Sequence, residues 1–172
     1  NSGLTYIELP DSVTWFGVGA FSQAPNLKTV KFEANSQLST ISQWAFYGSG
    51  IEEFKFTTSL LTKIDRYVFA QCVNLKSITI PASVISISED AFERCIDLAS
   101  VYFEENSKLD EIGVRAFHEC FKLKDVVLPA SVTKIYGGAF EDCFSMGTIT
   151  INSQITKTSS DAEIVLKVLR TL

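Results

Sequence analysis

Four regularly spaced cysteines are the residues of this sequence with the clearest capacity for chemistry. Cys72, Cys95, Cys120 and Cys143 follow one another at intervals of 23, 25 and 23 residues. Their thiolates could bind zinc, but a structural zinc site usually contains a Cys-x-x-Cys pair, and the sequence has none. Two cysteines one interval apart could instead form a disulfide. We favour buried free thiols, because cysteine often packs as a small apolar residue and Ala24 occupies the equivalent position near the N-terminus.

The other candidate catalytic groups lack the partners that catalysis requires. His118 is the only histidine, and no serine lies in a Gly-x-Ser-x-Gly context that would expose a nucleophile. We therefore expect His118 to be a solvated turn residue. The acidic pairs Glu104-Glu105 and Asp110-Glu111 lack the spacing of a calcium loop, so a solvated acidic face is the preferred interpretation. No catalytic residue, metal or cofactor is predicted, and we do not expect an enzyme.

A repeated unit positions all of these residues. One phenylalanine recurs at intervals of 23 to 25 residues, and alanine or valine precedes it in every copy. The six positions are Phe21, Phe46, Phe69, Phe92, Phe117 and Phe140. Further apolar positions lie five and eight residues before each phenylalanine, and each cysteine lies three residues after one. A period of this length falls in the range of leucine-rich repeats.

Each copy also contains a predicted β-strand. A leucine or methionine lies six residues after five of the six phenylalanines, and apolar residues follow three and five positions later, as in Leu123, Val126 and Leu128. Side chains alternate in direction along a strand, so these residues point inward and those between them point outward. Copies stacked at a spacing of ~4.8 Å would pair their strands in parallel and join their apolar side chains into one core.

These patterns predict a right-handed, β-rich leucine-rich-repeat solenoid over residues 1–151, with about six and a half repeats of 23–25 residues. We expect a parallel sheet on its concave face, and short strands, turns and one-turn helices on its back. Residues 152–172 break the pattern and predict a linker followed by a short capping helix, because Ser160 and Glu163 are spaced as at a helix start. The N-terminal edge has no visible lid, so we also expect further repeats before residue 1.

The outward strand positions are the candidate partner-binding surface, because solenoids bind partners on extended faces. The candidates on the strands are Tyr6, Glu8, Lys31, Glu53, Lys55, Thr79, Tyr102 and Asp125, and a second patch on the back contains Trp44, Tyr47 and Tyr67. Tyrosine and tryptophan are enriched in protein interfaces. Two other interpretations stay open: the outward charges could stabilise the sheet through cross-strand pairs, and the back aromatics could cover the outer shell.

Composition narrows the kinds of partner. The net charge is −5, and no run of Lys or Arg is present, so we do not expect nucleic-acid binding. No apolar run approaches the ~18 residues of a membrane span, so direct membrane insertion is not expected either. The remaining expectation is a protein ligand. The sequence does not determine the oligomeric state, and we expect a monomer.

The unit Leu-x-x-Ile-x-Ile-Pro-x-Ser-Val-x-x-Ile-x-x-x-Ala-Phe-x-x-Cys, in residues 75–95, with a close copy in 123–143, resembles the BspA-like leucine-rich repeats. The resemblance covers residues 4–151 and departs from the pattern where Ala24 and Ser49 replace the cysteine. It implies a non-enzymatic adhesion module of a cell-surface or secreted protein that binds host matrix or cell-surface proteins. It transfers no binding residue. An intracellular interaction scaffold and a structural spacer are the alternatives.

Overall fold

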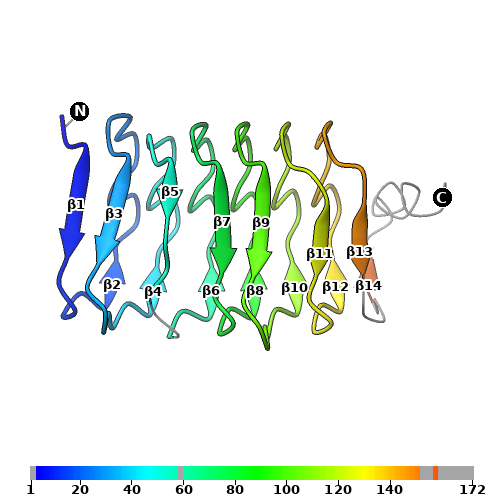
Figure 1. Cartoon of the computed structure of the whole chain (residues 1–172), viewed down its shortest axis with the longest axis horizontal. Coiled ribbons are helices and arrows are strands. Elements are labelled where there is room, and N and C mark those ends of the chain that lie inside the picture. The colour runs from blue at the N-terminus through cyan, green and yellow to red at the C-terminus, as the bar shows by residue number, and fades with distance from the viewer. Residues whose placement is uncertain (1–2, 58–59, 152–156, 159–172) are drawn as a thin grey trace.

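Apolar side chains at alternate positions make the first strand of each copy half buried, and these strands stack in parallel along one side of the molecule (Figure 1). A computed structural model describes residues 3–57, 60–151 and 157–158. The strands of this side are β1 (Tyr6–Leu9), β3 (Thr29–Phe32), β5 (Glu53–Phe54), β7 (Ser77–Ile80), β9 (Ser100–Phe103), β11 (Val126–Leu128) and β13 (Ile149–Ile151). The predicted repeat solenoid is thereby confirmed.

A second set of short strands lies on the other side of each coil. These are β2 (Trp15–Phe16), β4 (Thr40–Ile41), β6 (Lys63–Ile64), β8 (Ser86–Ile87), β10 (Glu111–Ile112), β12 (Lys134–Ile135) and β14 (Lys157–Thr158). Each ends in the apolar residue found five positions before the repeat phenylalanine, except that Thr158 ends the last. Figure 1 shows the two sets running in opposite directions across the coil, as the winding of the chain requires.

Each strand pairs with the equivalent strand of the next coil. Residues at equivalent positions of successive copies, which we call a column, therefore lie side by side. On the first side, β1, β3, β5, β7 and β9 form one five-stranded parallel sheet, while β11 pairs only with β13. On the second side, β6, β8, β10, β12 and β14 form another five-stranded sheet, and β2 pairs with β4. In the register of β7 and β9, Ile78 lies opposite Val101 and Thr79 lies opposite Tyr102. The break between β9 and β11 is the main irregularity of the first side.

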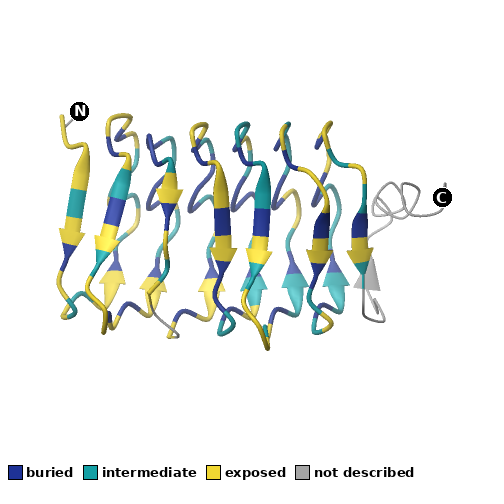
Figure 2. Ribbon diagram, viewed as in Figure 1, coloured by how far each residue is buried: buried dark blue, intermediate teal, exposed yellow. Residues whose placement is uncertain are grey.

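The repeat phenylalanines form one continuous stack inside the solenoid. Adjacent rings from Phe46 to Phe140 have centroids 5.0–5.5 Å apart and lie within 10° of parallel. Phe46, Phe69, Phe92 and Phe117 are fully buried. Figure 2 shows the burial repeating from coil to coil, with buried and exposed residues alternating along the strands. The predicted alignment of the phenylalanines is therefore confirmed.

The one-turn helices predicted on the back are absent from the part of the chain that the structure describes. Around Phe46, backbone N–H groups alternate between two kinds of partner. Those of Ala45 and Tyr47 donate to carbonyls three residues earlier, whereas those of Phe46 and Gly48 donate to the next coil. A helix would direct every N–H along its own axis, so hydrogen bonding between coils replaces it with a turn.

Positive backbone φ angles accompany this alternation. They occur two residues before and two residues after every repeat phenylalanine, with values of +50° to +65°. The residues are Gly19, Gln23, Trp44, Gly48, Tyr67, Gln71, Asp90, Arg94, Arg115, Glu119, Gly138 and Asp142. Only three of these twelve are glycine, the residue that adopts this conformation without steric cost. Seven of the other nine, all except Tyr67 and Asp142, donate their N–H to a carbonyl of the next coil, which holds them in this conformation.

Most of the predicted C-terminal segment lies outside the described residues. The capping helix predicted from Ser160 onward falls entirely in residues 159–172, which the structure does not describe. Lys157 and Thr158 form β14, which pairs with β12 and extends the second sheet by one strand.

The phenylalanine stack should dominate stability. Replacement Phe92→Ala removes a buried ring with stacking partners on both sides and should lower the free energy of unfolding by about 3–5 kcal/mol in a urea titration. Phe144→Ala is the matched control, because its ring also stacks, on Phe121 at 5.3 Å, but is 76% exposed. Its cost should stay below about 1 kcal/mol. Equal losses for the two variants would show that the buried phenylalanine stack contributes no more to the free energy of unfolding than an exposed ring pair.

At the positions with positive φ, glycine should stabilise the protein more than alanine does. At ordinary turn positions, the order of the two residues should be reversed. At Gln71, where φ is +58°, Gln71→Gly should be more stable than Gln71→Ala by about 1 kcal/mol, because alanine strains this conformation. At Gln43, where φ is not positive, alanine should be the more stable replacement. The thermal unfolding midpoints of the four variants test both expectations. A higher midpoint for Gln71→Ala than for Gln71→Gly would show that alanine is not strained at this position.

Candidate binding surface

The outward positions of the odd-numbered strands form what we call the front face. The eight candidates chosen on it are all exposed: Tyr6, Glu8, Lys31, Glu53, Lys55, Thr79, Tyr102 and Asp125. Strand register places Glu8 beside Lys31 and Thr79 beside Tyr102. The structure thus brings these side chains onto one surface, along the length of the solenoid. Whether they bind a partner stays a prediction.

At its N-terminal end, the front face satisfies its own polar groups. The Tyr6 hydroxyl donates to Glu8 Oε2 over 2.8 Å, and this hydrogen bond raises the pKa of Tyr6 above its ordinary value. Lys31 Nζ lies 5.3 Å from the centroid of the Tyr6 ring. The hydrogen bond lies within β1, whereas the Lys31–Tyr6 contact joins two strands and is an example of the cross-strand stabilisation that is the alternative to partner binding.

The aromatic candidates at the back turns differ from one another. Trp44 stacks on Tyr67, with centroids 5.6 Å apart and rings 9° from parallel, and only Trp44 counts as exposed. The side chain of Tyr67 hydrogen-bonds Asp90, which raises the pKa of Tyr67. Asp90 is only 1% exposed, and Arg115 Nε lies 3.2 Å from its Oδ1. Tyr47 is half-buried, and its N–H donates to the carbonyl oxygen of Trp44 at 3.1 Å. Tyr67 and Arg115 compensate the buried charge of Asp90, which supports the covering interpretation for Tyr67.

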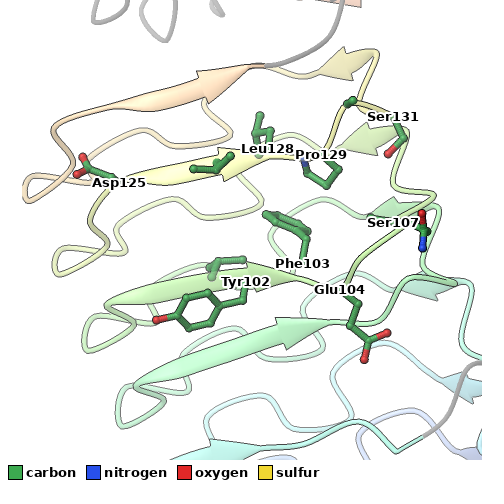
Figure 3. A pocket seen from close by; sticks show the side chains of 12 residues that line it. Tyr102, Phe103, Glu104, Ser107, Asp125, Leu128, Pro129 and Ser131 are labelled. Atoms are coloured by element: carbon green, nitrogen blue, oxygen red, sulfur yellow. The ribbon is translucent and has the colours of Figure 1, made fainter.

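The front face is hollowed where its sheet breaks, between β9 and β11. A cavity of about 560 Å³ opens there and is lined by both strands and by the corners that follow them. Figure 3 shows Phe103, Leu128 and Pro129 gathered between the strands, with Tyr102 on the outer surface of β9. Pockets of this volume are large enough to hold a small ligand or a few side chains.

Unequal corners explain the hollow. Fourteen residues separate Phe103 from Phe117, but only twelve separate Leu128 from Phe140, so the corner of one coil projects beyond the next. Glu104 donates its N–H to Ile80 at the end of β7, whereas Pro129, at the equivalent place, has no N–H to donate. The break in strand pairing between β9 and β11 thus coincides with a missing hydrogen bond at this corner.

Where a short corner that contains proline precedes a long corner, a side chain joins the two coils. After Pro10, the N–H of Asp11 donates to the carboxylate of Glu33 in the next coil at 3.0 Å. After Pro81, the N–H of Ala82 donates to Glu104 at 2.9 Å. A proline corner followed by a glutamate corner is thus joined by a side chain, since the acid accepts a backbone donor of the turn. Glu104 is exposed, as the expected solvated acidic face requires, and makes this hydrogen bond in addition.

Val127 lies at an outward strand position, as the alternation predicts, but is not among the binding candidates chosen from the sequence. Its side chain is 59% exposed beside Tyr102, which is 58% exposed, and both border the hollow. The register of β11 and β13 places Val127 beside Thr150, and the same column holds Thr79 in β7. A large apolar residue in a column that is otherwise largely polar was the available signal.

Charges on the even-numbered strands are paired with one another. Lys134 Nζ contacts Asp110 Oδ2 at 2.8 Å and Glu111 Oε1 at 2.6 Å, and Thr133 also hydrogen-bonds Asp110. The hydrogen bond from Lys134 holds the pKa of Asp110 below its ordinary value. Asp110 and Glu111 are therefore partners of a lysine, although both side chains remain partly exposed to solvent. A smaller hollow of about 330 Å³ nearby is lined by side chains of both signs.

The four cysteines are free and buried, as the favoured interpretation predicts. Each Sγ lies 3.1–3.3 Å from the carbonyl oxygen of the repeat phenylalanine in the preceding coil, to which its S–H donates. Burial raises the pKa of Cys72 and of Cys143 to about 12, and that of Cys95 and Cys120 well above the ordinary value. These thiols are therefore packing residues with little nucleophilic thiolate.

His118 is not the solvated turn residue that was expected. Its side chain is only 15% exposed, and the Nδ1 atom is buried without a hydrogen-bond partner. Carboxylate oxygens surround the ring at 3.7–4.0 Å and belong to Glu93, Glu119, Glu141 and Asp142. Glu119 is the next residue in the chain, but Glu93 comes from the preceding coil and Glu141 and Asp142 from the following one, so the environment of His118 depends largely on residues far away in sequence. Residues 3–57, 60–151 and 157–158 contain no group of three or more potential ligands able to hold a metal ion.

Coils of 23–25 residues, a stacked phenylalanine core and two parallel ladders together define a leucine-rich-repeat β-solenoid. Within that class, the chain belongs to the family described as the BspA type leucine rich repeat region. The family model matches residues 1–109 and 62–162, in six copies. The resemblance seen in the sequence is thereby confirmed.

Solved bacterial proteins share the fold. A leucine rich cell surface protein from Faecalibacterium prausnitzii is 31% identical, with a TM-score of 0.70, over 87% of this chain and 39% of that one. The leucine rich repeat protein of Treponema pallidum is 25% identical, with a TM-score of 0.57, over 86% of this chain and 59% of that one. The chain thus spans less than two thirds of either protein.

The remaining comparisons add little about function. A leucine-rich repeat protein from Bacteroides ovatus, 19% identical with a TM-score of 0.62 over 87% of this chain and 50% of that one, shares the fold. No curated protein matched the chain. Within the residues that the structure describes, no helix has the length and apolar character needed to cross a membrane.

The burial of the cysteines can be checked by thiol labelling. A maleimide reagent at pH 8 should modify none of the four thiols in the native protein and all four in denaturant, because burial blocks the reagent and suppresses the thiolate. Mass spectrometry counts the adducts. Fewer than four adducts after denaturation without reductant would reveal a disulfide.

Proposed function

We propose that this chain is a non-enzymatic protein-binding module of a cell-surface or secreted protein, and that its front face holds a host matrix or cell-surface protein. The observation that carries the proposal is the division of labour between columns. Inward columns are apolar in every coil, whereas outward columns differ from coil to coil and are exposed at most positions. A rigid scaffold with variable outward side chains is how solenoids present a binding surface.

The middle of the front face is best suited to contact a partner. Glu53, Lys55 and Thr79 are exposed, and Glu53 lies beside Ser77 of the next coil, with no acid or base opposite it. Further along, Tyr102 and Val127 add apolar area that is already accessible. Burial of such area, surrounded by polar groups, is the usual composition of a protein interface.

A surface location is supported by the relative from F. prausnitzii, which is described as a cell surface protein. At 31% identity, the two share the repeat closely enough for that description to guide the proposal. The family itself consists of repeats, and repeats of this kind act through contacts rather than through a catalytic centre. Specificity then depends on which side chains occupy the outward columns.

A structural spacer is the second candidate, and contacts within the front face favour it. The group of Tyr6, Glu8 and Lys31 is satisfied within the sheet, and Asp125 Oδ1 accepts the N–H of Thr148 at 2.7 Å. The four free thiols also fit the third alternative, an intracellular scaffold. Locating the full-length protein in its source cell separates the scaffold from the other two.

Binding and mutation decide between module and spacer. The chain should bind at least one member of a panel of purified matrix and plasma glycoproteins in biolayer interferometry. The triple variant Glu53→Ala, Lys55→Ala, Thr79→Ala should weaken that binding about tenfold or more, because it strips the centre of the front face.

The matched control carries Thr40→Ala, Thr62→Ala and Lys63→Ala, three exposed positions in and beside the even-numbered strands. It should keep its affinity within about twofold. Binding to no member of the panel, nor to fixed epithelial cells, would contradict the module and leave the spacer. Equal losses for both triple variants would place the binding surface elsewhere.

A further inference from the structure

We propose that the hollow between β9 and β11 holds an apolar anchor side chain of an extended, basic segment of the partner protein. This inference rests on the proposed function and adds the chemistry of the ligand. The hollow lies on the front face, where the sheet breaks, so a partner lying along this face would pass over it (Figure 3).

The walls of the hollow suit an aliphatic or aromatic side chain. Phe103, Leu128 and Pro129 line its interior, and Tyr102 and Val127 form exposed parts of its rim. The volume of about 560 Å³ exceeds that of a single large side chain, so the backbone on either side of an anchor can also settle into it. A central apolar anchor in a pocket is the usual form of an interface hot spot.

The charge of the lining selects a basic segment. Glu104 and Asp125 are the charged residues that line the hollow, and both are acidic. Each accepts one backbone N–H, from Ala82 and from Thr148, and neither forms an ion pair within the described part of the chain. In Figure 3, the two carboxylates lie at opposite ends of the hollow, so lysines or arginines on both sides of an anchor would meet one each.

The geometry of the backbone keeps the hollow open to an extended segment. Pro129 lacks the N–H that would tie the end of β11 to β9, and the longer corner at Asn106 and Ser107 projects above the shorter one. The Ser131 hydroxyl oxygen is buried in the wall without a hydrogen-bond partner. A bound segment that brings a backbone donor or acceptor to this hydroxyl would satisfy it.

The smaller hollow beside the even-numbered strands lacks this selectivity. Its lining contains Lys63 and Arg66 together with Glu89 and Glu111, and Arg66 Nη2 already lies 3.0 Å from Glu89 Oε2. Charges of both signs that pair with one another offer no preference for a basic or an acidic partner.

Three labelled peptides of equal length test the inference by fluorescence anisotropy at low salt. One has the sequence Gly-Lys-Lys-Leu-Lys-Lys-Gly, one has serine in place of leucine, and one has glutamate in place of every lysine. The leucine–lysine peptide should bind at least about tenfold more tightly than the other two, because it alone supplies both anchor and charge. Comparable binding of all three, or of none, would overturn the inference.

Variants locate the binding within the hollow. Val127→Lys should weaken binding of the leucine–lysine peptide about tenfold by removing apolar rim and repelling lysine. Asp125→Asn keeps the Oδ1 acceptor for Thr148 but loses the charge, and should weaken binding about threefold. Val114→Lys, at an exposed valine on the opposite side of the solenoid, should have no effect.

The outcomes separate this inference from the function on which it rests. If the chain binds a matrix glycoprotein but Val127→Lys binds it as tightly as the unmodified chain, the hollow is not the anchor site and the binding module stands. If the panel and all three peptides fail to bind, the function and the inference fall together. Each variant should unfold at the same midpoint temperature as the unmodified chain. A loss of binding is then not caused by a loss of folding.

Discussion

The distance between coils is the constraint on which every column of this solenoid depends. Backbone pairing sets neighbouring strands ~4.8 Å apart, and the phenylalanine rings stack at 5.0–5.5 Å, close to the same interval. One translation therefore suits the hydrogen bonds on both sides and the aromatic core between them. The turns around each phenylalanine obey it as well, because their N–H groups alternate between their own coil and the next. A side chain that packs well against a copy of itself at this spacing can occupy the same inward position in every coil. A side chain that does not is found at an outward position.

Sequence reasoning succeeded where a column repeats. Phe69, Phe92 and Phe117 were predicted to stack because equal spacing in sequence becomes equal position in a coil, and they do. The one-turn helices were wrong for a related reason. Ala, Phe and Cys at positions i, i+1 and i+4 satisfy helical spacing and also satisfy a turn with left-handed residues on both sides. The partner that decides between them is a carbonyl 22 or 24 residues away, which no local pattern contains.

The binding surface was predictable only in outline. Alternation placed Tyr102 and Asp125 on the outside, but the hollow beside them arises from two adjacent coils of unequal corner length and from a proline that cannot donate. Each coil alone looks regular. His118 illustrates the same limit: four carboxylates on three coils enclose it, although its neighbours in the chain suggest a solvated turn. Features that belong to the junction between repeats are invisible to an analysis that treats repeats one at a time.

The glutamate that seals a proline corner has a consequence for how such proteins change length. Glu33 completes the turn of the coil before it, at Asp11, and Glu104 does the same at Ala82. A genetic duplication or deletion that cut between these coils would leave an amide without its acid, or an acid without its amide. The two coils of each such pair are therefore coupled by a side chain as well as by backbone pairing.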